Sequence, residues 1–157
     1  MSKEIIVDAS NMVMGRLASI IAKELLNGNR VTVVNVEKVV ITGSNRDSIL
    51  ERFMKKLRLR SNVNPRRHGP FVPRSPEGIF RRVVRGMLPR RKTKGREAYR
   101  RLKVYRGVPD FIKTSEFKVY EEARYRENSY PYMYLEEISR LIGWIPVEER
   151  LKEVLGE

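Results

Sequence analysis

The first 42 residues alternate between two hydrophobic patterns, and this alternation constrains the fold more than any other feature of the chain. Short apolar runs rich in β-branched residues occur at 4–8, 31–36 and 39–42, a pattern typical of strands buried on both faces. Between the first two runs, residues 14–25 carry apolar side chains at the spacing of one helix face, and Gly28 follows at a C-cap position. A strand, a helix and a strand joined by short connections predict a right-handed βαβ unit and a parallel sheet.

Similar patterns continue further along the chain. Ser44 resembles the start of a capping box with Asp47, and it opens a helix that runs through Leu57. The other predicted elements are helices at 76–88, 97–102, 135–142 and 146–155, a strand at 102–105, and a short strand or extended segment around 117–119. We therefore predict an α/β fold with four strands, at 4–8, 31–36, 39–42 and 102–105.

The helix predicted at 76–88 has two contrasting faces. Ser75 and Pro76 suit its N-cap and N1 positions, and Pro89 ends it. At ~100° per residue, its apolar side chains share one half of the helix and its arginines share the other. The apolar half holds Ile79, Phe80, Val83, Val84, Met87 and Leu88, and the other half holds Arg81, Arg82 and Arg85. Such a helix can pack on its own domain through the apolar face and bind an anion through the arginine face at the same time.

The positive charge is concentrated in the central third of the chain. Residues 52–106 contain 20 basic and two acidic residues, a net charge of +18, whereas the remainder carries a net charge of −4. A solvated surface normally mixes signs, so this excess indicates a polyanionic partner. Most of these residues are arginine, which binds phosphate in a planar fork and stacks on bases, and this favours nucleic acid over a membrane surface. We expect extended basic loops at 61–75, which is rich in proline, and at 89–96.

Several classes of protein are excluded by what the sequence lacks. There is no cysteine, so disulfides and thiolate metal sites are absent, and a single histidine, His68, excludes a multi-histidine metal site. We interpret His68 as a hydrogen-bonding or stacking residue. No apolar run approaches ~18 residues, and the first residues do not resemble a signal peptide. We expect a cytoplasmic protein without metal, cofactor or membrane association.

An enzyme on a Rossmann-like fold is the main alternative. Residues 8–17 form a strand end, a loop and a helix start, where a phosphate could bind. However, this segment has one glycine where the dinucleotide fingerprint needs three, and it has no P-loop motif. We interpret Ser10 or Asn11 as the helix cap and Gly15 as a close-packing position. This alternative requires a nucleotide bound near 11–15.

The candidate acids and bases do not form a catalytic constellation. Asp8, Glu37 and Asp47 show no nucleophile–base–orienter spacing. A third alternative is a DNA-binding regulator, in which residues 134–155 form a helix-turn-helix. That segment is acidic and would repel phosphate, so we interpret it as a packing or protein-contact element. Basic residues spread over two loops and a helix suit an irregular folded RNA better than duplex DNA.

Several motifs resemble one family, the large-subunit ribosomal protein thirteen family. The motifs are Val84–Pro89, Lys94–Arg96 and Arg101–Gly107 in the central third, and Val7–Ala9, Met14–Ser19, Val34–Lys38 and Ile41–Gly43 near the N-terminus. They span residues 5–107 in order and at similar spacing. The segment 60–70 resembles the archaeal and eukaryotic branch of the family, and 135–144 resembles archaeal members.

This resemblance implies an architecture and a role. It implies a three-layer α/β/α sandwich with a four-stranded parallel sheet, no enzymatic activity, binding to large-subunit ribosomal RNA, and an early role in subunit assembly. We expect a single domain at 1–157, comprising an α/β core at 1–60 and 76–107, the basic loop at 61–75, and a C-terminal tail with helices at 108–157. The acidic tail is expected to contact neighbouring ribosomal proteins, and no small-molecule substrate is expected.

By position, the resemblance implies that RNA is contacted by the loop 62–73, the arginine face of the helix at 76–88, and residues 90–106. We add the flanking basic residues of the same region and call the whole the basic set. It consists of Lys55, Lys56, Arg58, Arg60, Arg66, Arg67, His68, Arg74, Arg81, Arg82, Arg85, Arg90, Arg91, Lys92, Lys94, Arg96, Arg100, Arg101, Lys103 and Arg106.

Overall fold

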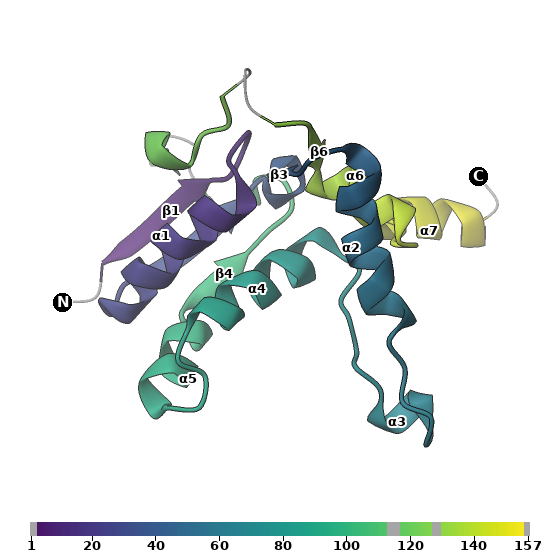
Figure 1. Cartoon of the computed structure of the whole chain (residues 1–157). Coiled ribbons are helices and arrows are strands. Elements are labelled where there is room, and N and C mark those ends of the chain that lie inside the picture. Colours follow the sequence, from purple (N-terminus) through teal and green to yellow (C-terminus); the bar gives the residue numbers. More distant parts are fainter. Residues whose placement is uncertain (1–2, 113–116, 127–129, 156–157) are drawn as a thin grey trace.

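The N-terminal part of the chain forms the predicted βαβ unit (Figure 1). The structure, a computed structural model, describes residues 3–112, 117–126 and 130–155. β1 (Glu4–Asp8) pairs in parallel with β2 (Arg30–Val34), and α1 (Met14–Leu26) connects them. Gly28 has a φ of 96°, a left-handed conformation that glycine adopts without strain, and it ends α1 as predicted.

The main sheet has four parallel strands, in the order β4-β2-β1-β5. β4 (Leu102–Val104) pairs with β2, and β5 (Phe117–Lys118) pairs with β1. Val7 and Val33, on the two central strands, are fully buried, as expected for a parallel sheet covered by helices. The predicted fold class is confirmed.

One strand of the prediction lies outside this sheet. Asn35 adopts a left-handed φ of 55° directly after β2, and a 3₁₀ turn, η1 (Val36–Lys38), then redirects the chain. β3 (Val40–Thr42) consequently pairs antiparallel with β6 (Tyr132–Tyr134) in a separate two-stranded sheet. The assignment of 39–42 to the parallel sheet was wrong, and β5 supplies the fourth strand instead.

Helices flank the sheet, as the predicted α/β/α sandwich requires. α4 (Pro76–Met87) packs against α1, and α5 (Thr93–Arg100) lies beside both α1 and β4 (Figure 1). Phe80 from α4 and Leu17 from α1 are completely buried in the same core. The core therefore fixes α4 rigidly on the scaffold.

Residues 59–75, between α2 (Arg46–Arg58) and α4, project from the molecule as a long arm. The cap of α2 is Asn45, whose side chain accepts a hydrogen bond from the backbone N–H of Ser48 at 2.7 Å, so the predicted capping role of Ser44 was wrong. The arm was predicted as an extended loop at 61–75, but it contains a single helical turn, α3 (Pro65–His68), at its tip (Figure 1). A proline at the first helical position favours this turn.

The C-terminal part contains a 3₁₀ turn, η3 (Glu121–Ala123), and the two predicted helices. α6 (Leu135–Leu141) buries Leu135 and Ile138, whereas α7 (Val147–Leu155) lies at the periphery (Figure 1). Within the described ranges, no helix has both the length and the apolar character needed to cross a membrane.

Candidate nucleic-acid interface

The two faces of α4 are arranged as the helical periodicity predicted. The Ser75 hydroxyl accepts a hydrogen bond from the Gly78 N–H at 3.2 Å and caps the helix. Ile79, Phe80, Val84 and Leu88 are buried, while Arg81 and Arg82 are exposed and Arg85 is half-buried. Met87, assigned to the apolar half, is 42% exposed because it lies at the last turn of the helix. The arginine face is therefore held outward by a buried apolar face.

The arm brings further basic residues beside α4. An Nη of Arg82 donates a hydrogen bond of 2.7 Å to the carbonyl of Phe71, and this contact ties the arm to the helix. Arg74 lies against the backbone of Gly143, near α6. The other basic residues of the arm, Arg60, Arg66, Arg67 and His68, are all exposed.

The third basic segment is mostly helical. The helix predicted at 97–102 begins at Thr93, so the last part of the loop predicted at 89–96 belongs to α5. The buried Gly95 explains this compact turn, because a Cβ at this position would overlap the carbonyl group of Pro89. The basic residues around it, Arg90, Arg91, Lys92, Lys94, Arg96 and Arg100, are exposed.

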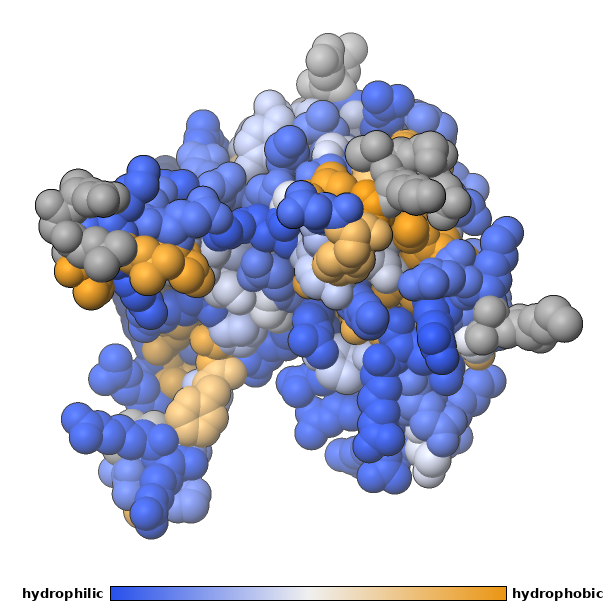
Figure 2. Space-filling model, turned by 180° about the vertical axis from the view of Figure 1, so that it is seen from behind, coloured by the Kyte–Doolittle hydropathy of each residue, from blue (hydrophilic) through white to orange (hydrophobic). Residues whose placement is uncertain are grey.

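These segments form two projections at one edge of the molecule. In Figure 2, which shows the molecule from behind, both projections are hydrophilic at their outer parts, with an indentation between them. The arm with α3 is at the lower left and α5 is at the lower right. Lys55, Lys56 and Arg58 lie exposed on α2, which leads into the arm, and Lys103 lies exposed on β4.

The three segments meet in a hollow of about 390 Å³. Its lining includes Phe71 of the arm, Gly78, Arg82 and Arg85 of α4, Arg90, and Tyr99 of α5. A second hollow of about 300 Å³ shares Arg85, Arg90 and Tyr99 with the first and adds Arg96 and Arg100. Neither Phe71 nor Tyr99 was predicted from the sequence to be part of this surface. For Phe71 a signal was present, because an aromatic residue in a proline-rich segment without periodicity indicates an exposed ring.

Little of the positive charge is neutralised within the protein. Among the residues that the structure describes, only Lys55 and Arg106 of the basic set form ion pairs with carboxylates. Seventeen of the twenty residues are exposed, and Arg85, Arg101 and Arg106 are half-buried. The surface that the sequence predicted is therefore assembled and largely uncompensated.

Arg101 and Arg106, both half-buried, contact parts of the chain that lie far from them in the sequence. An Nη of Arg101 donates a hydrogen bond of 2.9 Å to the carbonyl of Leu25, at the C-terminal end of α1. Arg106 pairs with Glu148 of α7 at 2.9 Å, and its guanidinium lies 5.4 Å from the ring centroid of Trp144. Both arginines hold secondary structure elements together.

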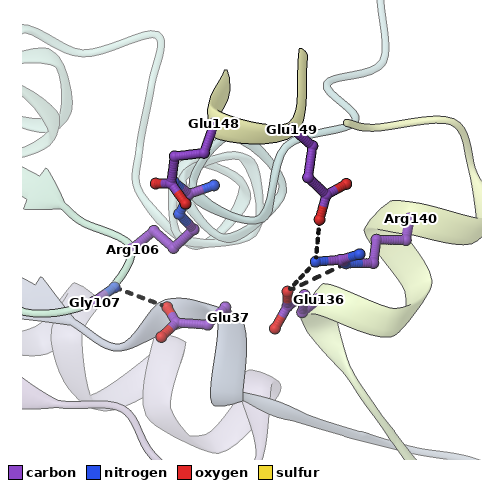
Figure 3. A network of polar contacts seen from close by, with 7 residues as sticks. All are labelled: Glu37, Arg106, Gly107, Glu136, Arg140, Glu148 and Glu149. Atoms are coloured by element: carbon purple, nitrogen blue, oxygen red, sulfur yellow. Dashed lines mark hydrogen bonds and ion pairs between the residues drawn. The ribbon is translucent and has the colours of Figure 1, made fainter. Parts of the chain in front are cut away.

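Arg106 belongs to a polar network that connects the core to the C-terminal helices (Figure 3). Glu37, which is buried, accepts a hydrogen bond of 3.0 Å from the N–H of Gly107. Arg140 of α6 pairs with Glu136 at 3.1 Å and with Glu149 of α7 at 2.9 Å. The hydrogen bond to Glu136 and the charge of Glu149 raise the pKa of the Arg140 guanidinium above its ordinary value. The carboxylates of Glu148 and Glu149 thus attach α7 to Arg106 and to α6.

The strand-loop-helix segment at 8–17 does not form the cap that was predicted. The N-cap of α1 is Val13, without a side-chain hydrogen bond, and the Ser10 hydroxyl donates to Asp8 instead. Asn11 has a left-handed φ of 57°, and Gly15 is exposed with open space around its Cα. The caps at Ser10 or Asn11 and the close packing at Gly15 were therefore wrong, because the loop turns toward β6 and η3 before the helix begins.

The candidate acids occupy structural positions. Asp8 accepts hydrogen bonds at the end of β1, Glu37 holds Gly107, and Asp47 lies in the first turn of α2. Over the described ranges, no three His, Cys, Asp or Glu side chains are grouped as a metal site would require.

The fold and this surface define a scaffold protein with a large basic face, a class that differs from enzymes with an enclosed active site. A family model described as ribosomal protein L13 matches residues 2–110. The chain belongs to the ribosomal protein L13 family. It is therefore a structural, non-enzymatic ribosomal protein, as the resemblance implied.

Curated relatives extend the similarity into the C-terminal part. The chain is 46% identical to the large ribosomal subunit protein uL13 of Archaeoglobus fulgidus, over 88% of this chain and 87% of that protein. Identity to uL13 of Aeropyrum pernix is 44%, over 91% and 92% of the two chains. Identity to uL13 of Thermoplasma volcanium is 39%, over 96% and 98%. These archaeal relatives confirm the resemblance of the chain to the archaeal members of the family.

Proposed function

We propose that this protein binds large-subunit ribosomal RNA through the basic set and organises that RNA within the subunit. The observation that carries the proposal is the convergence of the arm, α4 and α5 into one exposed basic surface with few internal ion pairs. Phosphate groups of the RNA would supply the missing counter-charges. Because arginine forks bind phosphate in defined directions, a rigid arginine face also favours a particular RNA shape.

The mechanism is the joining of RNA segments. The arm and α5 project from opposite ends of α4, so one protein can neutralise phosphates on two RNA strands that approach each other. Neutralisation lowers the repulsion between these strands. Arg101 and Arg106, which are engaged internally, would contribute mainly by holding the surface in place.

An early role in assembly agrees with this mechanism. The α/β core places α4 by burying its apolar face, so the arginine face does not depend on RNA for its geometry. A prefolded basic surface can bind RNA before other proteins join. We propose that the protein acts in the cytoplasm, at this early stage of large-subunit formation.

A charge-reversal experiment tests RNA binding. Arg81→Glu, Arg82→Glu and Arg85→Glu combined should abolish binding to large-subunit ribosomal RNA and co-sedimentation with large subunits, because they place carboxylates on the rigid face of α4. The matched control is Arg16→Glu, Lys23→Glu and Arg30→Glu, which changes the charge equally at exposed positions outside the basic set. Equal loss of binding in both variants would contradict the proposal, and loss of helical circular dichroism in the first would make the arginine face structural.

We also propose that the acidic tail contacts a neighbouring large-subunit protein. Val147, Leu151 and Val154 follow each other along one side of α7 and are 65%, 53% and 78% exposed. In Figure 2 an apolar patch lies at the left edge, over the C-terminal helices. Exposed apolar side chains on a segment of acidic character suit an apolar protein surface with a basic rim, and they do not suit RNA.

A further inference from the structure

We infer that the hollow between the arm, α4 and α5 binds one unpaired nucleotide of the RNA, an inference that rests on the proposed RNA binding. The hollow of about 390 Å³ falls within the range of about 300–1,000 Å³ that small-ligand pockets occupy. It combines two aromatic rings with three guanidinium groups. A nucleotide presents the matching pair of groups, a flat base and a phosphate.

The aromatic residues provide the surface for the base. Phe71 is 67% exposed, although it is large and apolar, and the Arg82 bond to its carbonyl fixes the backbone that carries it. Tyr99 is half-buried and therefore held in place, and the guanidinium of Arg81 lies 5.4 Å from its ring centroid. Unpaired bases stack on such rings, and each stacked base contributes about 1–3 kcal/mol.

The arginines provide the surface for the phosphate. Arg82, Arg85 and Arg90 line the hollow, and none of the described residues that line it carries a carboxylate. Arg85 and Arg90 also line the adjoining hollow of about 300 Å³, together with Arg96 and Arg100. The basic surface thus continues into this adjoining hollow, where the next phosphate of the chain can be bound.

This combination distinguishes an unpaired nucleotide from other anionic ligands. The bases of a duplex are stacked on each other, so a duplex would satisfy the arginines and leave Phe71 uncovered. An acidic peptide would also pair with the arginines without offering a ring face. An unpaired base together with its phosphate uses both halves of the hollow.

Chemical probing of base accessibility on protein-free large-subunit ribosomal RNA tests this inference. The protein should protect at least one unpaired base. Phe71→Leu, which keeps the apolar bulk and removes the ring, should expose this base and lower the affinity about 5- to 150-fold. Phe71→Tyr should restore both the protection and the affinity. Because Phe71 is exposed, both variants are expected to fold.

Phe111→Leu is the matched control, since Phe111 is also exposed, at 72%, but does not line the hollow. It should leave the footprint unchanged. Identical footprints and affinities for Phe71→Leu and the unsubstituted protein would overturn the inference, while RNA binding through the arginines would stand. Weaker association of Phe71→Leu with other ribosomal proteins alone would assign the ring to a protein contact and overturn the inference as well. Failure of the unsubstituted protein to bind the RNA would overturn the proposed function itself.

Discussion

The pairing of β1 with β2 determines the surroundings of the Asp8 side chain. Asp8 was considered as a catalytic acid, but its carboxylate accepts hydrogen bonds from the backbone and hydroxyl of Ser10 at 3.1 and 2.8 Å and from Asn35 at 2.9 Å. Asn35 is 27 positions away and has the left-handed conformation that ends β2. A contact made by the pairing of two strands cannot be read from either strand alone.

The environment of Asp8 leads to a pH-dependent prediction. Burial tends to raise the pKa of Asp8, but the hydrogen bonds from Asn35 and Ser10 and the charge of Lys38 outweigh it, so the pKa lies below its ordinary value of 3.8. A depressed carboxyl pKa stabilises the folded state above the unfolded pKa, and this stability is lost as the pH falls through the folded pKa. Asp8→Asn should therefore lower the free energy of unfolding by about 1 kcal/mol at pH 7.

The measurement is urea unfolding of both proteins between pH 7 and pH 2. The difference between them should stay constant down to about pH 4 and shrink below it. The exposed Asp110→Asn is the control and should show no such difference. A difference for Asp8→Asn that is the same at pH 2 and pH 7 would contradict the role of the charged carboxylate.

At the scale of elements, the sequence predicted those that depend on local pattern. β1, α1, β2 and α4 follow from hydrophobic periodicity and from caps such as Ser75. The partners of the short strands could not be predicted, because β5 has two residues and β6 has three, too few for a period to be visible. The basic segments were predicted individually, but their meeting around Phe71 and Tyr99 depends on how the arm packs on α4.

The C-terminal helix α7 carries a prediction of its own. Val147→Ser with Leu151→Ser should leave the fold and the affinity for free ribosomal RNA unchanged, because both side chains are exposed. If a neighbouring protein covers them, the variant should bind large-subunit particles lacking this protein at least about tenfold more weakly than the unsubstituted protein does, since one buried Leu contributes about 1.5–3 kcal/mol. Co-sedimentation with these particles and with free RNA measures the two affinities. Equal retention on the particles would contradict a protein contact at α7.

At the scale of the whole molecule, charge is separated along the chain and in space. The net charge of +18 in residues 52–106 lies on the second half of α2, the arm, α4, α5 and the strand that follows, while the remainder is slightly acidic. This distribution is visible in the sequence, and from it we predicted an exposed basic surface and a polyanionic partner. The three-dimensional arrangement adds that part of the acidic remainder is used to anchor α7 to Arg106 and Arg140.

The affinity of the protein for ribosomal RNA should consequently fall steeply with salt. Each neutralised phosphate contributes about −0.7 to −0.9 to the slope of log affinity against log salt concentration, because bound cations are released. Replacing Arg81, Arg82 and Arg85 by Gln, which removes the charges without adding carboxylates, should give a shallower slope than replacing Arg16, Lys23 and Arg30 by Gln. Filter binding across a series of salt concentrations measures both slopes, and a flat response of the unsubstituted protein would rule out phosphate contacts as the main source of affinity.

The strand order of the sheet also determines how long one edge of β1 lacks a partner strand while the protein is being synthesised. β1 is the first strand to be made, yet its second neighbour, β5, begins more than a hundred residues later, with Ile6 opposite Phe117. At about 5–20 residues per second, one edge of β1 stays open for roughly 5–20 s in the nascent chain. An open strand edge invites pairing with other chains. The newly made protein is therefore most prone to aggregation before residue 117 is reached, and a chaperone that covers β1 would act in this interval.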